Sequence, residues 1–330
     1  MGKRSNMNLE KLKTILGERV KKNEPMAHHT TFKIGGPADL FCDAKTTEEL
    51  VRFILSARKL DVPAFILGGG SNILVGDGGI RGLVVKNSTE KIVIAGVKGA
   101  YKSGVQAGTV FVQADSGVEM NKLVRFTIEE GLAGLEAQLG LPGTVGGAMY
   151  MNSKWTHPVG YVGDCVYQAT IITVKNEVKV VSQSYFNFGY DQSSLQTNGD
   201  IVLSVVFRLK QGNKKELWNV ANQSMVYRHE TQPQGIKSPG CTFRNVSKAD
   251  ALRVPTPNQT TSAGYLVDHA GLKGLSHGDA QISPVHANFI INRAKANASD
   301  VVYLIEQARK KVKEQFGVTL TEEIVRVGEF

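Results

Sequence analysis

Apolar residues recur at helical spacing in several stretches of the chain. In residues 46–61, "TTEELVRFILSARKLD", the apolar stripe comprises Leu50, Phe53, Ile54 and Ala57. Residues three and four apart lie on one face of a helix, and Thr46 with Glu49 has the spacing of an N-terminal capping box. We therefore predict an amphipathic helix here, with one buried face.

Two further helices follow from the same spacing. One covers residues 118–130, and Gly131 comes next, where helices commonly end in a left-handed residue. The other lies in "ASDVVYLIEQARKKVKEQFG", residues 298–317, with Ser299 as its cap and Gly317 as its stop. The basic residues near the end of this helix are expected to form its solvated side.

Short apolar runs rich in branched residues predict strands between the helices. The clearest runs are 62–70, 82–86, 91–97, 108–115, 167–176 and 200–210. The last third of the chain is expected to alternate strands and loops until the final helix. This mixture of helices and strands predicts an α+β fold.

The order of these elements suggests three compact units in series. We place the units at residues 1–87, 88–215 and 216–330, with "QGNKKELWN" (211–219) as the linker before the third. The C-terminal tail could return to the first unit. Residues 1–20 are charged and poor in aromatic side chains, so a mobile start is compatible with their composition.

The composition limits the classes of partner that we expect this chain to bind, but it identifies no single partner. A chain of 330 residues can bury its own cores, and its net charge of +9 suits either an anionic ligand or simple solubility. The basic residues are dispersed, so we expect no nucleic-acid partner. The 35 glycines gather in clusters, which indicates loops where backbone must approach a ligand or another strand closely.

The spacing of the cysteines and histidines argues against disulfide bonds and metal sites. The three cysteines show no C-x-x-C pairing, and the histidines show no spacing such as H-E-x-x-H. We expect reduced thiols and no metal. The start "MGKRSNMNLE" lacks an apolar signal region, and no stretch reaches the ~20 apolar residues that span a membrane, so a cytoplasmic location is expected.

Two glycine clusters are candidates for holding a phosphate. "ILGGGSNILVGDGG" (66–79) follows a predicted strand, and backbone without side chains lets N–H groups converge on an anion; a tight turn is the alternative. "GLEAQLGLPGTVGGAMYMN" (134–152) is the second cluster, and the two loops could close on one pyrophosphate. The Rossmann fingerprint fails because residue 73 is Ile73, and no P-loop occurs.

The order of these motifs carries a family resemblance. "TFKIGGPADL" (31–40), then "GGGSNIL", then "LGLPGTVGGAMYMN" is followed by "RHETQP" (228–233), "SPGCTFRN" (238–245), "AQISPVHANFIIN" (280–292) and "GVTLTEEIVRVGE" (317–329). From about residue 24 onward the chain resembles the UDP-N-acetylenolpyruvoylglucosamine reductase (MurB) family. The resemblance is to its shorter subclass, which lacks an extra loop in the substrate domain.

The resemblance implies a three-unit flavoprotein. A two-part FAD-binding region of the vanillyl-alcohol-oxidase type would precede a C-terminal substrate domain for a UDP-sugar. NADPH would reduce FAD, and the reduced flavin would pass hydride to UDP-N-acetylglucosamine enolpyruvate, giving UDP-N-acetylmuramate for peptidoglycan synthesis. A monomer is expected. The residues that would hold FAD are Gly68, Gly69, Gly70, Ser71, Asn72, Gly143, Thr144, Gly146 and Gly147.

The resemblance also assigns the reacting groups. Cys241 stands where the family usually has a serine proton donor, and a thiol with its ordinary pKa of about 8.5 is mostly protonated at neutral pH. A buried small hydrophobe and a disulfide partner stay open as alternatives. Glu323 matches the family's carboxylic acid, with a plain surface glutamate as the alternative.

Several residues match positions that contact the substrate. The set comprises Tyr190, Arg244, Asn245 and Gln281. Arg228 and Gln232 fit the motif that leads into the substrate domain, but simple packing explains them equally well.

One departure concerns the substrate's carboxylate. The family has an arginine after the tyrosine of this motif, whereas this chain reads "YDQSSLQ", with Asp191 after Tyr190. A carboxylate there would repel the substrate, and we hypothesise that Lys154 or Arg244 compensates. A FAD-linked oxidase of the same flavin-binding fold, or a non-catalytic descendant that binds UDP-sugar, remains an alternative.

Overall fold

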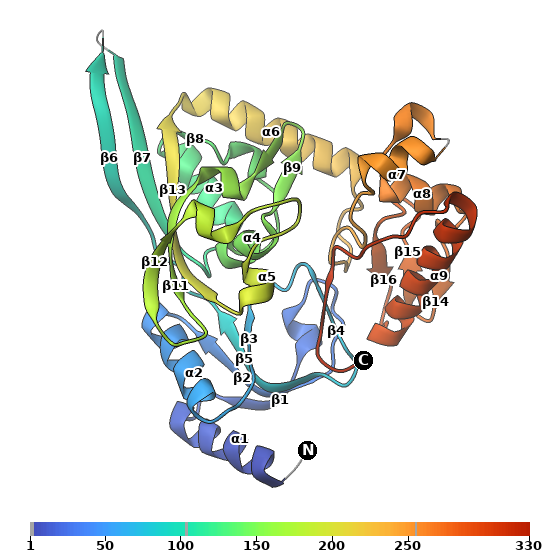
Figure 1. Ribbon diagram of the computed structural model, residues 1–330, viewed down its shortest axis with the longest axis horizontal. Helices are drawn as coiled ribbons and strands as arrows, with labels where there is room; N and C mark the ends of the chain where they lie inside the picture. The colour runs from blue at the N-terminus through green and yellow to red at the C-terminus, as the bar shows by residue number, and fades with distance from the viewer. Residues whose placement is uncertain (1–2, 103–104, 255) are drawn as a thin grey trace. The chain divides into compact units, whose positions relative to one another are not determined.

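The computed structural model describes residues 3–102, 105–254 and 256–330 (Figure 1). Contacts between residues group the chain into two compact units, each assembled from separate segments. Unit 1 contains residues 3–20, Cys42–Gly69 and Val84–Arg228; unit 2 contains Lys21–Phe41, Gly70–Leu83 and His229–Phe330. The division into 1–87, 88–215 and 216–330 stays a prediction.

Unit 1 holds most of the regular structure. Its helices are α1 (Lys3–Leu16), α2 (Thr47–Lys59), α3 (Met120–Glu129), α4 (Val145–Met151), α5 (Leu195–Asn198) and most of α6 (Lys214–Thr231). Its strands are β3 (Ala64–Leu67), β6 (Ile92–Lys102), β7 (Val105–Asp115), β8 (Leu132–Ala133), β9 (Lys154–Thr156), β10 (Val159–Tyr161), β11 (Val166–Ile172), β12 (Val178–Ser182) and β13 (Ile201–Gln211).

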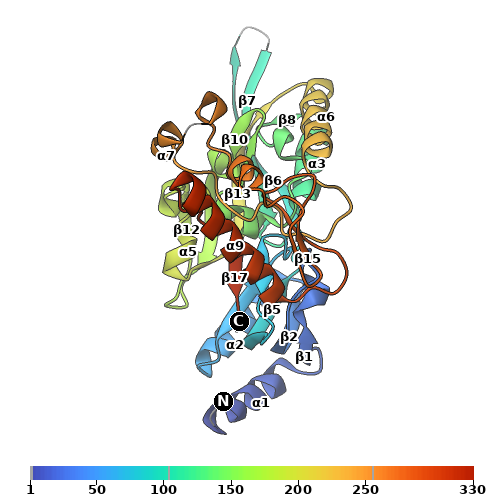
Figure 2. The ribbon, with the colours of Figure 1, turned by 90° about the vertical axis from the view of Figure 1, so that its right-hand side faces the viewer.

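The main sheet of unit 1 is antiparallel. Its strand order is β12-β11-β13-β7-β6, and β8 pairs with the end of β13. Successive strand residues point to opposite faces, so alternate positions enter the core. In β7 and β13 these are Val110, Val112, Ala114, Val205, Phe207 and Leu209. The hairpin of β6 and β7 extends beyond its neighbouring strands (Figures 1 and 2).

Unit 2 is built from both ends of the chain. Its elements are β1 (Lys21–Pro25), β4 (Ile73–Val75), α7 (Lys248–Arg253), α8 (Ala263–His269), β14 (Ser276–His277), β15 (Ala280–Ile282), β16 (Ile290–Asn292), α9 (Ala298–Phe316) and β17 (Val325–Val327). Strands β2 (Pro37–Ala44) and β5 (Ile80–Asn87) begin in unit 2 and end in unit 1. Strand β17 pairs in parallel with β4. The core packs Phe32, Ile34 and Leu74 with apolar residues of α8 and α9.

The predicted helices form, with one capping error. Helix α2 begins after Thr46, whose hydroxyl accepts from Glu49 N at 3.2 Å. Helix α3 ends before Gly131, which has φ +66°. The predicted cap Ser299 of α9 is wrong.

The cap of α9 is Asn297. The Asn297 side chain accepts from Asp300 N at 2.9 Å, and the Asp300 carboxylate accepts from Asn297 N at 3.1 Å. Ala298 N and Ser299 N donate to the Asp77 carboxylate at 2.7 and 3.0 Å. Ala298 and Ser299 are therefore the first residues of α9, and Asp77, distant in the chain, satisfies two N–H groups that have no partner within the helix.

Other predictions fail where tertiary packing decides. The predicted linker 211–219 instead enters α6, a mostly polar helix that buries little beyond Leu217, Ala221 and Ser224. Trp218 of α6 donates to the Glu129 carboxylate at 3.0 Å, which ties α6 to α3. The last third contains α7 and α8 as well as strands and loops. A polar helix of this kind gives no periodic signal in sequence.

The start of the chain is a helix. In α1, Leu9, Leu12 and Leu16 are buried at helical spacing, and Asn8 donates to Leu60 O at the end of α2 at 2.9 Å. The second glycine cluster is also partly helical, because α4 begins at Val145 and includes Gly146 and Gly147.

Candidate functional site

The two glycine clusters meet in unit 1. A Cβ atom built on Gly69 would lie 2.6 Å from Gly143 Cα, and one built on Gly68 would lie 2.5 Å from Thr144 Oγ1. Side chains at either glycine would therefore force the loops apart. Both loops stay half-exposed, so side-chain-free backbone is accessible to a ligand, as an FAD pyrophosphate requires.

The N–H groups in the first turn of α4 already donate hydrogen bonds within the protein. Val145 N donates to Val118 O at 2.8 Å, and Gly146 N donates to Ser116 O at 2.7 Å. Gly147 N donates to Thr144 Oγ1 at 3.4 Å, which makes Thr144 the cap of α4. A phosphate held by these loops would have to use other N–H groups.

The remaining glycine-loop residues belong to unit 2. Gly70 has φ +63°, and a Cβ on it would lie 2.2 Å from His29 O. Asn72 donates from its side chain to Glu323 O at 3.2 Å, and Asn72 O accepts from Val325 N at 2.9 Å. Ser71 lies half-exposed between them. Asn72 thus anchors the segment that carries Glu323.

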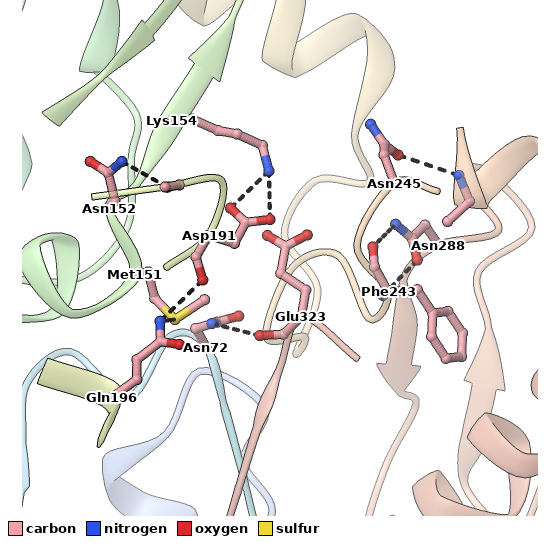
Figure 3. Close-up of polar contacts among 12 residues, drawn as sticks. Asn72, Met151, Asn152, Lys154, Asp191, Gln196, Phe243, Asn245, Asn288 and Glu323 are labelled. Atoms are coloured by element: carbon pink, nitrogen blue, oxygen red, sulfur yellow. Dashed lines mark hydrogen bonds and ion pairs between the residues drawn. The ribbon is translucent and has the colours of Figure 1, made fainter. Parts of the chain in front are cut away.

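Lys154 and Asp191 form an ion pair in unit 1 (Figure 3). The Lys154 ammonium donates to both carboxylate oxygens of Asp191, at 2.8 and 2.7 Å. The same nitrogen lies 3.6 Å from the ring centroid of Tyr190, a cation–π distance. The side chains of Lys154 and Asp191 are only 15% and 4% exposed. Lys154, one of the two cations in our hypothesis, therefore contacts Asp191 directly, and its compensating role stays a prediction.

The segment that carries Tyr190 and Asp191 is fixed to the end of α4. Gly189 and Gln192 pair across a tight turn in which Asp191 has φ +51°, a conformation that aspartate tolerates. Asn152, the left-handed cap of α4, donates to Gly189 O at 2.9 Å. Gln196 donates to Asp191 O at 3.0 Å. The ion pair is therefore held by a rigid backbone.

Cys241 and Glu323 lie on neighbouring segments of unit 2. Glu323 N donates to Thr242 O at 2.8 Å, and Arg244 N donates to Thr321 O at 2.9 Å. Cys241 itself pairs as a backbone bridge with Phe289 on the other side. The extended segment 241–244, which we call the 241–244 strand, is therefore held by isolated β-bridges between residues 288–289 and 321–323. Cys241 is half-buried at its start.

Arginines hold the residue next to Glu323. Arg326 donates to both carboxylate oxygens of Glu322 at 2.8 Å, and Arg309 reaches the same carboxylate at 2.8 Å. The Glu322 carboxylate is the first cause that raises the pKa of Arg326. Glu322 is thus held in a structural ion-pair network, and Glu323 stays the glutamate that the family resemblance assigns to chemistry.

The other predicted substrate residues of unit 2 occupy different parts of it. The Asn245 side chain accepts from Ala263 N at the start of α8, at 3.3 Å. Gln281, on β15, donates to Gly274 O at 3.0 Å. Arg244 lies at the end of the segment that begins with Cys241. Its Nε is buried without a hydrogen-bond partner among the described residues. A buried guanidinium nitrogen of this kind is suited to an anionic ligand.

Arg228, Cys42 and Cys165 are in surroundings that indicate packing roles. The Arg228 guanidinium lies 3.8 Å from the ring centroid of Trp155, which favours the packing interpretation. Gln232 O accepts from the Gln234 side chain at 2.9 Å. Burial raises the pKa of Cys42 to about 12 and that of Cys165 to about 11, so both thiols stay protonated. None of the three cysteines is in a disulfide.

The part of the chain that the structure describes shows neither a metal cluster nor a membrane-spanning helix. Within residues 3–102, 105–254 and 256–330, no group of three or more His, Cys, Asp or Glu side chains is arranged to hold a metal ion. Across the same described residues, no helix has the length and apolar character needed to cross a membrane.

Asn288 is the residue of unit 2 that sequence reasoning missed. It lies in the quoted motif 280–292, is 3% exposed, and bonds the backbone of Phe243 through its side-chain amide (Figure 3). Polar residues in loops are common, so nothing in the sequence singles it out.

Comparisons with known proteins agree with this geometry. Residues 232–327 match the family described as UDP-N-acetylenolpyruvoylglucosamine reductase, C-terminal domain, and residues 38–182 match the FAD binding domain. The curated UDP-N-acetylenolpyruvoylglucosamine reductase of Clostridium kluyveri is 35% identical over 321 residues, 97% of either chain. That of Caldanaerobacter subterraneus is 37% identical over 327 residues, 97% of this chain and 98% of the relative.

A solved structure shares the fold. The crystal structure of the Thermus caldophilus UDP-N-acetylenolpyruvylglucosamine reductase (MurB) is 32% identical, with a TM-score of 0.73. The match covers 94% of this chain and 99% of that one. The predicted α+β fold class, with an FAD-binding region before a C-terminal substrate domain, is confirmed. Since the similarity extends over nearly the whole chain, this protein belongs to the UDP-N-acetylenolpyruvoylglucosamine reductase family.

Proposed function

We propose that this chain uses NADPH and FAD to reduce UDP-N-acetylglucosamine enolpyruvate to UDP-N-acetylmuramate, a peptidoglycan precursor. Family membership over nearly the full length supports the activity. The observation that carries the proposal is the strand pairing in unit 2, where Glu323 N bonds Thr242 O at 2.8 Å and so brings the Cys241 and Glu323 segments together.

The glycine loops of unit 1 would hold the cofactor. The match of residues 38–182 to the FAD binding domain and the close approach of Gly69 to Gly143 support this role. FAD held there would supply the hydride-transfer chemistry that links NADPH to the substrate. Gly68, Gly69, Gly143 and Thr144 would shape the loops, while Gly146 and Gly147 would contribute the close-packed start of α4.

Cys241 would donate the proton, and Glu323 would stabilise the charge that develops on the substrate. Hydride addition to the methylene carbon of the enol ether leaves negative charge on the neighbouring carbon and its carboxylate. A proton from the Cys241 thiol to that carbon completes the reduction, and solvent then reprotonates the thiolate. Glu323, as a carboxylic acid, would stabilise the charge that develops on the substrate's carboxylate.

Lys154 would cancel the charge of Asp191. A lone carboxylate would repel an anionic substrate, but both oxygens of Asp191 receive hydrogen bonds from Lys154. Of the two cations in our hypothesis, Lys154 therefore has the contact. Tyr190, whose ring contacts Lys154, stays a proposed substrate residue of unit 1. Within unit 2, the proposed substrate residues are Arg244, Asn245 and Gln281.

Product analysis tests the activity. Under anaerobic conditions, one equivalent of NADPH should yield one equivalent of UDP-N-acetylmuramate when the enolpyruvate is added. If the enolpyruvate instead stays unchanged, and the reduced protein forms hydrogen peroxide once air is admitted, the protein is an oxidase. We further propose that the enzyme works as a monomer in the cytoplasm.

A further inference from the structure

Every polar atom of Asn288 is hydrogen-bonded, and most of these bonds reach the strand that carries Cys241. The side-chain oxygen accepts from Phe243 N at 2.9 Å, and the side-chain nitrogen donates to Phe243 O at 2.8 Å. Asn288 O accepts from Thr242 N at 2.7 Å. Asn288 thus supplies backbone and amide contacts to residues 242–243, on the flank where Phe289 bridges Cys241.

The loop that presents Asn288 is itself tightly held. Ser283 Oγ accepts from the N–H groups of Val285 and His286, and Phe289 N donates to His286 O at 2.9 Å. Asn288 N donates to His286 Nδ1 at 3.2 Å. Burial lowers the pKa of His286, so its ring stays neutral and keeps this acceptor at neutral pH.

The opposite flank of the strand is occupied by the Glu323 segment. Glu323 N bonds Thr242 O, and Arg244 N bonds Thr321 O. The position of Cys241 relative to Glu323 therefore depends on a strand with two partners, one of which is Asn288. Since Asn288 is 3% exposed, water cannot readily replace its amide.

We propose that Asn288 is a positioning residue for proton transfer: its amide fixes the 241–244 strand and so aligns Cys241 with Glu323. This inference rests on the proposed function. It deepens that function by naming a residue that would touch neither substrate nor cofactor but would control the step that delivers the proton. A misplacement of about 1 Å can cost about 100-fold in rate.

The test compares the two half-reactions in three variants. Asn288→Ala removes the amide. Asn292→Ala is the matched control, because Asn292 is 5% exposed and its side chain bonds Phe32 O, Ala294 N and Ala296 N instead of the 241–244 strand. Asn288→Asp keeps the shape of the amide and, once protonated, can again donate to Phe243 O.

The expected results separate positioning from general stability. In Asn288→Ala, reduction of the flavin by NADPH should stay within about 3-fold of wild type, whereas reoxidation by the enolpyruvate should slow about 100-fold, with a larger solvent isotope effect. Asn292→Ala should leave both rates within about 3-fold of wild type. Relative to wild type at each pH, Asn288→Asp should recover reoxidation as the pH falls, because a buried carboxyl then becomes protonated.

Other outcomes would overturn the inference. If Asn288→Ala reoxidises as fast as Asn292→Ala, or if both half-reactions of Asn288→Ala fall equally, the residue is only structural. If Asn288→Ala does not fold, Asn288→Asp decides. A reoxidation rate that is lowered relative to wild type by the same factor at every pH would again mean that Asn288 is only structural. A wild-type protein whose reduced flavin ignores the enolpyruvate would overturn the proposed function itself, and this inference with it.

Discussion

The carboxylate of Asp191 would repel an anionic substrate if it were alone, but it is paired with a cation. From the sequence, Asp191 is a negative charge where an anionic substrate would bind. In the structure its oxygens are occupied by Lys154, which also lies on the ring of Tyr190. The departure from the family motif thus comes with its own compensation, from a residue 37 positions away in the chain.

Removing Lys154 should therefore destabilise the protein. Lys154→Met leaves the carboxylate of Asp191, 4% exposed, without its cation, and breaking a buried pair in this way costs about 3 kcal/mol. Lys122→Met is the control, because Lys122 and Glu90 form a pair that is 52% and 77% exposed and should change the free energy of unfolding by less than about 0.5 kcal/mol. Urea titration measures both. Equal losses in the two variants would mean that the buried pair is not special.

Motifs of the sequence named some residues well and missed others. Cys241 and Glu323 could be picked out because they stand in recognisable strings, although their roles stay proposals. The partner of Asp191 was only a hypothesis with two candidates, and Asn288 was not singled out. Contacts of this kind depend on which loops the fold brings together, and no local pattern encodes that.

At the scale of elements, helix ends show the same limit. The extents of α2, α3 and α9 follow from apolar spacing, and the glycines after α3 and α9, Gly131 and Gly317, are where the pattern predicts them. The cap of α9 differs from the predicted one, because Asn297 forms a capping box with Asp300 and the helix begins at Ala298. Asp77 adds hydrogen bonds from the N–H groups of Ala298 and Ser299. The mostly polar helix α6 was missed for a related reason, since its contacts with α3 replace a strong apolar stripe.

The corrected cap of α9 can be tested directly. Asn297→Ala should lower the free energy of unfolding by about 1 kcal/mol, because it removes the acceptor of Asp300 N. Ser299→Ala should cost less than about 0.5 kcal/mol, because the Ser299 hydroxyl only donates to Asn297 Oδ1. Thermal or urea unfolding distinguishes them. A larger loss for Ser299→Ala would restore serine as the cap.

At the scale of the whole molecule, the chain does not fold as a simple series of segments. Unit 2 takes residues Lys21–Phe41 and Gly70–Leu83 into one core with the last third of the chain. Strand β17 pairs with β4, more than two hundred residues earlier. Reading along the chain favours contiguous units, because long-range pairings leave little trace in local periodicity. Even so, the family resemblance correctly gave the fold class.

The central claim is that Cys241 supplies the proton when the enolpyruvate is reduced. The most direct measurement follows oxidised-flavin absorbance in the anaerobic protein, first with one equivalent of NADPH and then with the enolpyruvate. It compares wild type, Cys241→Ser and Cys241→Ala.

All three proteins should be reduced by NADPH at similar rates. Wild type and Cys241→Ser should then recover the oxidised band as UDP-N-acetylmuramate forms, whereas Cys241→Ala should recover it at least about 100-fold more slowly, because the general acid is missing. Recovery at the wild-type rate in Cys241→Ala would contradict the account and remove Cys241 from the mechanism.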